Sequence, residues 1–460
     1  MFTLEEISAA VGGKLIDPST GQTITGVSCD SRTLKKGDLF VPLKGEHFDG
    51  HTFLEDVFQK GASAALVDRP IKISHPLILV QDTLKALQQL ASYYKKRFQI
   101  PTIAVTGSAG KTTTKECIGM AFSKFFKVRV SLGNWNNHLG VPLNLFQLNS
   151  SDQFMVLELG ANHIGEIKVL SEMAQPSVGV ITGIYPVHLE GFGSLEGIYK
   201  AKLELADYLD HEGGTVIANG DDPILVKRLQ NRHFHLITFG TTRECDYQMS
   251  NLSVEDGTVQ FNVNQKYHFN LKGYGSFNAR NVLAAIATAG FFDLNLQSLS
   301  ESWKELPKIN NRFKIEHWQS HHLLVVDDSY NANPKSFEQA IESFKEIARD
   351  RRKIIVIGDM LELGEQACAY HENLGRFIAH QKIDVVIAIG PLSRYAIETL
   401  SRIDSHAIVY HFEKVEMACS SLISLLKEDD SLLIKGSHSM ELYKVKPYLE
   451  ERFNTTSASV

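Results

Sequence analysis

The sequence predicts an α/β protein of three domains, with a mostly parallel sheet in the central domain and a Rossmann-like sheet in the C-terminal domain. At 460 residues the chain is longer than one hydrophobic core usually organises, which favours two or three domains. From residue 100 onward, short apolar and β-branched runs alternate with helical stretches, as they do in βα units. The pattern changes near residues 83 and 314. We therefore expect domains at 1–83, 84–313 and 314–460.

The first domain is predicted to be a small α/β unit. Residues 39–43 and 64–67 form short apolar runs that suit buried strands, and residues 51–61 suit a helix between them. In residues 84–98 the apolar side chains recur at every third or fourth position, which predicts a helix. We expect this helix to link the first domain to the second.

The central domain begins with an apolar strand at 102–106, which runs into a glycine-rich turn and then a helix. Residues 155–159 and 178–182 predict further buried strands between helices, and this order favours a parallel sheet. Residues 258–271 alternate between apolar and polar side chains, as antiparallel strands do.

Four apolar runs separated by helical stretches predict the sheet of the C-terminal domain. They cover residues 323–327, 353–358, 385–390 and 431–435. Strands that alternate with helices in this way form a doubly wound sheet of the Rossmann type.

The composition argues against nucleic-acid binding and membrane insertion. The formal net charge is -6, and no long block of Lys and Arg is present. No apolar run is long enough to span a bilayer, and the N-terminus lacks the pattern of a signal peptide. The five cysteines are far apart and none has CxxC spacing, so neither a disulfide framework nor a zinc site is indicated. We expect a cytoplasmic protein.

The glycine-rich turn after residue 106 is the strongest functional signal. Its glycines let successive backbone N–H groups face phosphate oxygens, and the helix that follows adds its positive dipole end. Lys111 can place its charge on the β- and γ-phosphates of ATP, and Thr112 can offer a hydroxyl to Mg²⁺. The usual first glycine is replaced by Val105. The predicted phosphate-binding loop (P-loop) comprises Gly107, Ser108, Ala109, Gly110, Lys111, Thr112 and Thr113.

Other polar residues are ambiguous when each is considered alone. Glu158 ends a predicted strand, where a carboxylate can reach Mg²⁺ but is more often solvated. Asn137 lies in an asparagine-rich segment that can pair with a base or form a turn. A lone His188 is usually structural, and Lys202 would ordinarily be solvated on a helix.

Together these residues resemble the Mur ligase family, over nearly the whole chain. The segments that carry the resemblance are 106–113, 134–142, Glu158-Leu-Gly, His188, Ala201-Lys202, Asn278-Ala-Arg-Asn281, Asn311-Arg312-Phe and 327–334. Four stretches resemble the members that join D-alanyl-D-alanine to a UDP-N-acetylmuramoyl tripeptide; they cover 29–34 with 37–41, 188–196, 328–334 and 357–364. His438 stands where relatives often carry Arg, which weakens any role carried over to that side chain.

The resemblance implies a peptidoglycan-precursor ligase that uses ATP to convert the tripeptide carboxylate into an acyl phosphate, which the amine then attacks. It implies that Lys111 acts on the γ-phosphate and that Thr112 and Glu158 hold one Mg²⁺. It further implies that His188 and Lys202 serve a second Mg²⁺, with Lys202 carbamylated so that it offers oxygen to the cation. Lys111, His188 and Lys202 are the implied catalytic residues.

The resemblance also implies binding roles. Asn137 and Asn281 would lie near the adenine, and Arg312 would reach the phosphates when the third domain closes. Asp328 would bind the ribose, with its neighbour Asp327 as the alternative. In the first domain, Ser31 and Arg32 would hold the uridine nucleotide, because a guanidinium forks onto a diphosphate.

Two other classes stay open. One is a different ligase of the superfamily, such as a folylpolyglutamate synthase or a Mur ligase that adds a single amino acid. The other is a nucleotide-binding regulator without catalysis, which the presence of Lys111, Glu158, His188 and Lys202 disfavours. We expect a monomer. The third residue of the tripeptide, lysine or diaminopimelate, is left open.

Overall fold

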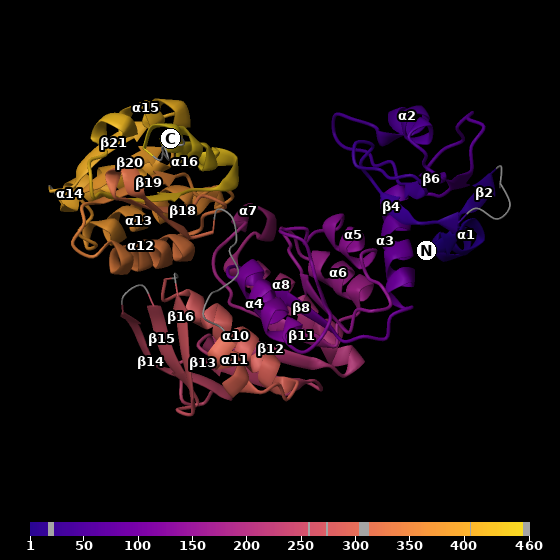
Figure 1. Ribbon diagram of the computed structural model, residues 1–460, viewed down its shortest axis with the longest axis horizontal. Helices are drawn as coiled ribbons and strands as arrows, with labels where there is room; N and C mark the ends of the chain where they lie inside the picture. Colours follow the sequence, from indigo (N-terminus) through magenta and orange to yellow (C-terminus); the bar gives the residue numbers. More distant parts are fainter. Residues whose placement is uncertain (17–22, 256–257, 273–274, 303–311, 405, 454–460) are drawn as a thin grey trace, which may run out of the picture.

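The computed structural model describes residues 1–16, 23–255, 258–272, 275–302, 312–404 and 406–453. Figure 1 shows three bodies in chain order, coloured indigo, purple to salmon, and orange to yellow. In the described ranges the strands form one sheet of five, one of nine and one of six strands, and a separate pair, β1 (Phe2–Thr3) with β3 (Thr23–Ile24). This confirms the predicted α/β class with its parallel-sheet centre and Rossmann-like C-terminal body. The domain boundaries after residues 83 and 313 stay predictions.

The N-terminal sheet is mostly parallel, and β2 runs antiparallel at one edge. Its order is β2 (Lys14–Ile16), β7 (Leu77–Leu79), β6 (Ala64–Val67), β5 (Asp38–Phe40) and β4 (Gly26–Ser28). Its helices are α1 (Leu4–Val11), the 3₁₀ turn η1 (Gly50–Phe53) and α2 (Leu54–Gln59). The predicted helix at 51–61 is therefore confirmed as η1 plus α2. The strand predicted at 39–43 ends earlier, because Pro42 has no N–H to donate to the ladder.

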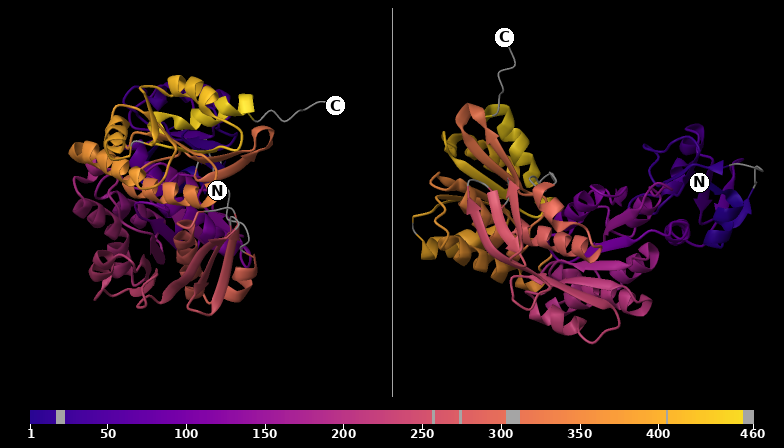
Figure 2. Two further views of the ribbon diagram at one scale, coloured as in Figure 1. Left: turned by 90° about the vertical axis from the view of Figure 1, so that its left-hand side faces the viewer. Right: turned by 60° about the horizontal axis from the view of Figure 1, so that its bottom comes forward.

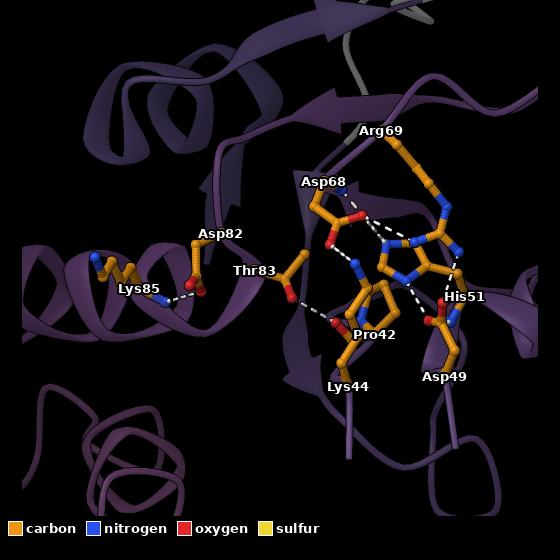
Figure 3. A network of polar contacts seen from close by, with 9 residues as sticks. All are labelled: Pro42, Lys44, Asp49, His51, Asp68, Arg69, Asp82, Thr83 and Lys85. Carbon is orange, nitrogen blue, oxygen red and sulfur yellow. Dashed lines mark hydrogen bonds and ion pairs between the residues drawn. The ribbon is translucent and has the colours of Figure 1, made fainter. Parts of the chain in front are cut away.

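A polar network joins the loops that follow β5 and β6 (Figure 3). The buried His51 lies between Asp49 and Asp68, at 2.6 Å from Asp49 and 3.3 Å from Asp68. Lys44 pairs with Asp68 at 2.6 Å, and Arg69 pairs with Asp49 at 2.6 Å. The network fixes the loops at the carboxyl edge of this sheet, the edge where open α/β sheets usually bind ligands.

Helix α3 (Thr83–Lys95) connects the N-terminal body to the central one, as predicted (Figure 1). Asp82 caps it by accepting a hydrogen bond from the Lys85 N–H at 2.9 Å. Its buried face includes Leu87, Leu90 and Tyr94.

The central sheet has nine strands, and its last three in chain order are joined by antiparallel ladders. Two of these three strands cover the range 258–271 that was predicted to be antiparallel. The order of the sheet is β16 (Tyr267–Lys272), β15 (Thr258–Val263), β14 (Tyr247–Glu255), β13 (His235–Gly240), β12 (Thr215–Asn219), β11 (Val178–Ile181), β8 (Thr102–Thr106), β10 (Phe154–Glu158) and β9 (Val128–Val130). Helices α4 (Lys111–Ser123) and α10 (Asn278–Phe291) pack into one apolar cluster with strand residues. Helices α6 (Glu166–Ala174) and α8 (Leu195–Glu212) pack into another. The remaining helices are α5 (Gly140–Leu145), α7 (Leu189–Phe192), α9 (Pro223–Leu229) and α11 (Leu296–Ser302).

The C-terminal sheet is parallel apart from its first strand, which pairs antiparallel. Its order is β17 (Lys314–Trp318), β18 (Leu323–Asp328), β22 (Ser431–Lys435), β19 (Lys353–Gly358), β20 (Val385–Ile389) and β21 (Ile408–Phe412). Its helices are α12 (Pro334–Ala348), α13 (Ala367–Ala379), α14 (Ser393–Ile403), α15 (Val415–Leu425) and α16 (Val445–Phe453). Two apolar clusters fill its faces.

The three bodies are arranged so that the N-terminal and C-terminal ones lie apart, each in contact with the central body (Figures 1 and 2). In the part of the chain that the structure describes, no helix has the length and apolar character needed to cross a membrane.

Candidate active site

A cleft of about 930 Å³ lies where the central and C-terminal bodies meet. The P-loop and the end of β10 form its floor, and the segment after β18 lines it from the C-terminal side. Helix α3 reaches its rim with Leu84 and Gln88. Most of the predicted nucleotide-binding residues therefore share one cavity.

The P-loop follows β8 and leads into α4 as the sequence predicts. Gly107 has a φ of 144°, and a Cβ there would lie 2.1 Å from Thr182 Oγ1. Gly110 has a φ of 79°, and a Cβ there would lie 2.2 Å from Asn281 Oδ1. Both positions therefore require glycine. Val105 is fully buried inside β8, so the residue that replaces the usual first glycine belongs to the strand and not to the loop.

Lys111 lies inside the loop, and its Nζ donates to the Gly107 carbonyl oxygen at 3.0 Å. Burial lowers the pKa of Lys111; Glu158 opposes this shift, and the nearby Arg312 adds to it. Two cationic side chains from different bodies thus approach the same space. An anion between them would relieve their mutual repulsion, as a nucleotide phosphate does.

Glu158 ends β10 and is almost completely buried beside the P-loop. Its Oε2 accepts from the Thr112 hydroxyl at 2.7 Å, and its Oε1 accepts from Asn136 Nδ2 at 2.7 Å. No group of three His, Cys, Asp or Glu side chains suited to a metal occurs among the residues that the structure describes. Mg²⁺ needs fewer protein ligands, because it commonly takes one or two oxygens from the protein and the rest from phosphate and water. The pair Thr112 and Glu158 fits that donor set.

Asn136 is a contact that the sequence did not single out. Asn137, the predicted residue, also lines the cleft, but its Oδ1 accepts from the Leu139 and Gly140 N–H groups at 3.1 and 2.9 Å. Asn137 therefore holds the entry to α5. The asparagine-rich pattern marked this segment, but the choice between neighbouring side chains depends on which one points at Glu158.

His188 lines the cleft and directly precedes α7, with a left-handed backbone at φ 48°. Its Nδ1 is hydrogen-bonded to Oε2 of Glu362, which belongs to the C-terminal body. Burial lowers the pKa of His188. Glu362 was not predicted as a contact, since 174 residues separate it from His188.

Lys202 is buried in α8 with 1% of its surface exposed, so the interpretation as a solvated helix lysine is wrong. Its Nζ donates to the Ala161 carbonyl oxygen at 3.3 Å and lies over the Phe192 ring. Burial, with the charge of Lys111 as the next contribution, lowers the pKa of Lys202 to about 7. Lys202 does not itself line the cleft; it lies behind the wall to which Ala161 belongs.

Arg312 and Asp328 line the cleft from the C-terminal side. The predicted boundary would count Arg312 with the central domain, but Phe313 packs in the C-terminal core, so we assign Arg312 to the C-terminal body. The Arg312 guanidinium lies 4.1 Å above the centre of the Tyr330 ring. Asp328 accepts from Lys435 Nζ at 2.6 Å and from the Phe313 N–H at 3.0 Å. Lys435 was not predicted, although a lysine that ends the apolar strand β22 was a usable signal.

Asp327, the alternative to Asp328, does not line the cleft. It is buried, and its Oδ1 accepts from the Ser329 N–H and hydroxyl at 3.1 and 2.6 Å. Of the two, only Asp328 is therefore placed to meet a ligand.

Asn281 of α10 lines the cleft beside Gly110 and donates to Asn278 Oδ1 at 3.0 Å. His438 also lines the cleft, and its ring lies 5.6 Å from the Tyr330 ring. The predicted Asn311 lies outside the described residues.

Ser31 and Arg32 do not line this cleft. They follow β4 at the carboxyl edge of the N-terminal sheet, the same edge that carries the network of Figure 3. Arg32 is exposed and binds Asp30 through Nε at 2.9 Å and Nη2 at 2.7 Å, which lowers the pKa of Asp30 to about 2. Lys60 Nζ donates to the Ser31 carbonyl oxygen at 3.0 Å. Both cations have acidic partners, Asp30 for Arg32 and Asp56 for Lys60, which a diphosphate would have to displace.

Comparison with known proteins adds independent evidence. Three family models match the chain: the Mur ligase middle domain over residues 105–289, the "Mur ligase, glutamate ligase domain" over 311–438, and the Mur ligase family catalytic domain over 23–95. UDP-N-acetylmuramoyl-tripeptide–D-alanyl-D-alanine ligases are among the similar proteins. The one from Bacillus subtilis is 36% identical over 96% of this chain and 97% of its own length. The one from Escherichia coli is 32% identical over 98% of both chains.

Solved structures agree with these matches. A crystal structure of MurF from Acinetobacter baumannii superposes with a TM-score of 0.90 at 31% identity, covering 98% of this chain and 99% of that one. MurF from Thermotoga maritima in complex with ADP gives a TM-score of 0.83 at 26% identity, covering 94% and 98%. The family models together match far more than half of the residues, and the relatives align along almost the full length. The chain belongs to the Mur ligase family.

Proposed function

We propose that this chain is an ATP-dependent ligase that joins D-alanyl-D-alanine to UDP-N-acetylmuramoyl tripeptide in the synthesis of peptidoglycan precursors. The observation that carries the proposal is the cleft between the central and C-terminal bodies, where Lys111 and Arg312 approach one anion-binding space next to the buried Glu158. The full-length similarity to ligases of this name supports the choice of substrates.

The reaction needs ATP because joining a carboxylate to an amine in water is energetically uphill. The terminal carboxylate of the tripeptide attacks the γ-phosphorus, ADP leaves, and an acyl phosphate forms. The amine of D-alanyl-D-alanine then attacks the carbonyl carbon, and the tetrahedral intermediate collapses to an amide and inorganic phosphate. Lys111 and Arg312 stabilise the negative charge that develops on the transferring phosphoryl group. The similarity to a MurF solved with ADP supports use of this nucleotide.

Thr112 and Glu158 would hold one Mg²⁺, and their buried oxygens fit that ion. The ion would neutralise charge on the phosphates. At the nucleoside end, Asn281 beside Gly110 suits the adenine, and Asn137 lies near enough to line the same cleft. Asp328, held by Lys435, presents a carboxylate that suits a ribose hydroxyl.

His188 and Lys202 would serve a second Mg²⁺, with Lys202 as its carbamate. Carbon dioxide reacts only with a neutral amine, and the pKa of about 7 gives Lys202 a large neutral fraction near neutral pH. A carbamate would replace a buried ammonium, which repels cations, by an anion that offers oxygen. The burial of Lys202 behind Ala161 supports a role other than solvation of a helix.

The uridine nucleotide would bind at the carboxyl edge of the N-terminal sheet, where Ser31 and Arg32 lie. Because this edge and the ATP cleft belong to different bodies, the substrate must extend between them.

Both ATP and UDP-linked precursors are cytoplasmic metabolites, so we place the activity in the cytoplasm. We propose that one chain suffices, since the cleft is assembled from a single chain.

A phosphate-release assay tests the proposal against the other ligase classes. Purified protein is given ATP, Mg²⁺ and the muramoyl tripeptide in its lysine or its diaminopimelate form. D-Alanyl-D-alanine should stimulate phosphate release, and single amino acids should not. Stimulation by a single amino acid alone would indicate a different member of the superfamily, and no stimulation by any amine would favour a nucleotide-binding regulator.

A further inference from the structure

The central and C-terminal bodies touch at α7 through two separate hydrogen bonds to one residue. Glu362 Oε2 accepts from His188 Nδ1, and the Glu362 carbonyl oxygen accepts from the Glu190 N–H at 3.2 Å. Leu189, between the two donors, packs against the apolar clusters of both bodies. The segment 188–190 is therefore one of the places where the C-terminal body contacts the central body, beside the contact of Phe277 with the C-terminal core.

Glu362 lies in a loop that hydrogen bonds and buried side chains hold in place. It belongs to the loop 359–363, which follows β19. In this loop the Met360 N–H donates to His371 Nε2 at 3.0 Å, and the Leu361 N–H donates to Ser437 Oγ at 2.9 Å. Met360 and Leu363 are buried in the C-terminal core. The carboxylate position is thus set by the C-terminal body, and the loop cannot easily move on its own.

Both residues of the contact adopt left-handed backbones, with φ 48° at His188 and φ 62° at Glu362. Such conformations cost free energy for residues other than glycine. The Glu362 side chain is half exposed, and ion pairs at exposed positions contribute little stability. Stability alone therefore does not explain the arrangement, whereas both residues line the cleft.

The chemistry of the contact selects one form of the imidazole. A carboxylate can only accept a hydrogen bond, so the proton of His188 must be on Nδ1. Nε2 of the neutral ring then carries the lone pair, which is the form that binds a cation. Lys111 and Lys202 both lie within electrostatic range of the ring. A carboxylate that holds the far nitrogen of a metal-binding histidine is a recurrent way to fix its tautomer and direction.

We propose that Glu362 is a positioning residue for His188: it fixes the Nδ1–H tautomer and the direction of the ring, and it does so only when the C-terminal body rests on α7. His188 is therefore oriented for reaction only when the C-terminal body, which carries Arg312 and Asp328, is docked on the central body. The part of this inference that concerns a cation at Nε2 rests on the proposed function; the tautomer and its dependence on Glu362 do not.

The direct test is ¹⁵N NMR of protein labelled at histidine, recorded at a pH where the ring is neutral. The two ring nitrogens have separate shifts that identify the tautomer, and a His188→Gln variant assigns the signal among the 18 histidines. We expect the Nδ1–H tautomer in the wild type and in Glu362→Gln, because the glutamine carbonyl oxygen can still accept. Glu362→Ala should give a mixture of tautomers. The control is Glu365→Gln, an exposed glutamate just beyond the same loop, which should match the wild type.

Kinetics give the second readout. Glu362→Ala should lower kcat by about tenfold at saturating ATP, as losses of such supporting contacts do, while KM for ATP stays nearly constant. Glu362→Gln should recover part of the loss. An unchanged tautomer in Glu362→Ala, or a loss that falls entirely on KM, would overturn the inference. Neither result would touch the proposed function, which fails only if the wild type does not ligate.

Discussion

Lys111 and Arg312 show how single residues favour the binding of an anionic ligand. Burial lowers the pKa of Lys111, and Arg312 reinforces that shift from the other side of the cleft. The Glu158 carboxylate compensates these two cations only in part, because the pKa of Lys111 still falls. A triphosphate supplies the missing negative charge at the place where the P-loop N–H groups converge.

Lys111→Ala should abolish most phosphoryl transfer. The charge of Lys111 matters most on the transferring group, so kcat should fall by about 10²–10³-fold, the range seen when one stabilising donor is removed. The free energy of unfolding should change by no more than about 1 kcal/mol, because burial already disfavours this ammonium and its hydrogen bond to the Gly107 carbonyl oxygen is a single one. Phosphate release and urea unfolding measure the two effects, with the exposed Lys127→Ala as control. A variant with near-normal turnover would show that the P-loop assignment is wrong.

Lys202→Ala should be nearly inactive, since no carbamate can form. Short carboxylic acids such as acetate should restore part of the rate by filling the vacated space, and bicarbonate should not. With bicarbonate limiting, the wild-type rate should rise between about pH 6 and pH 8, because the neutral amine becomes the major form above the pKa of about 7. Lys200→Ala, an exposed change on the same helix, is the matched control. Wild-type rates in Lys202→Ala at saturating Mg²⁺ would exclude the carbamate.

The sequence predicted those site residues whose local pattern carries the chemistry. Lys111 and Thr112 stand in a loop between a strand and a helix, and Glu158 ends a strand, so their placement follows from neighbours in the chain. Glu362 and Lys435 could not be found in this way. Each meets its partner across more than 100 residues, and that contact depends on how the C-terminal body folds and docks.

At the scale of elements, the buried strands of the C-terminal sheet were predictable and its two edge strands were not, although the buried β12 of the central sheet was also missed. β8, β19 and β22 coincide with the predicted runs, because strands covered on both faces are continuously apolar. β17 and β21 were not predicted as strands. They form the two edges of the C-terminal sheet, where half-exposed positions admit polar residues and the apolar run disappears.

An ion pair nevertheless joins β17 to α16, and its contribution to the free energy of unfolding should be measurable. Glu316 accepts from Lys446 at 2.6 Å and pairs with Lys314 at 2.7 Å. Burial raises the pKa of Glu316, but these lysines and the Trp318 N–H outweigh it and lower the pKa to about 2. A carboxyl group whose pKa falls on folding stabilises the native state above its unfolded pKa of 4.5.

Glu316→Gln should therefore lower the free energy of unfolding by about 2 kcal/mol near neutral pH. The difference from the wild type should shrink as the pH falls from 4.5 towards 2, because the wild-type carboxylate becomes protonated in that window. Urea unfolding at a series of pH values measures it, with the exposed Glu428→Gln as control. A difference that does not depend on pH would show that charge is not its cause.

At the scale of the whole molecule, the two predicted ligand sites are carried by separate bodies. The predicted uridine site lies on the N-terminal sheet, and the cleft proposed for ATP lies between the other two bodies. The C-terminal body lies apart from the N-terminal one in Figures 1 and 2. Reaction across such a distance requires the bodies to approach once ligands are bound. Sequence patterns report local structure, so they could not give this arrangement.

Arg312→Ala should weaken use of ATP more than binding of the UDP-linked tripeptide. Arg312 faces the P-loop from the C-terminal body, and the loss of a hydrogen bond to a charged phosphate should raise KM for ATP by roughly tenfold or more. Calorimetry of both ligands with the variant measures the two effects. The opposite order would mean that Arg312 serves the other ligand.

The central claim is that ATP activates the tripeptide carboxylate as an acyl phosphate. A UDP-N-acetylmuramoyl tripeptide labelled with ¹⁸O at both oxygens of its terminal carboxylate tests it directly. If the carboxylate attacks the γ-phosphorus, one ¹⁸O becomes the bridging oxygen and leaves with the phosphate when D-alanyl-D-alanine attacks. ³¹P NMR of the released phosphate should therefore show one ¹⁸O for each amide formed. Ligation that releases unlabelled phosphate would contradict the account.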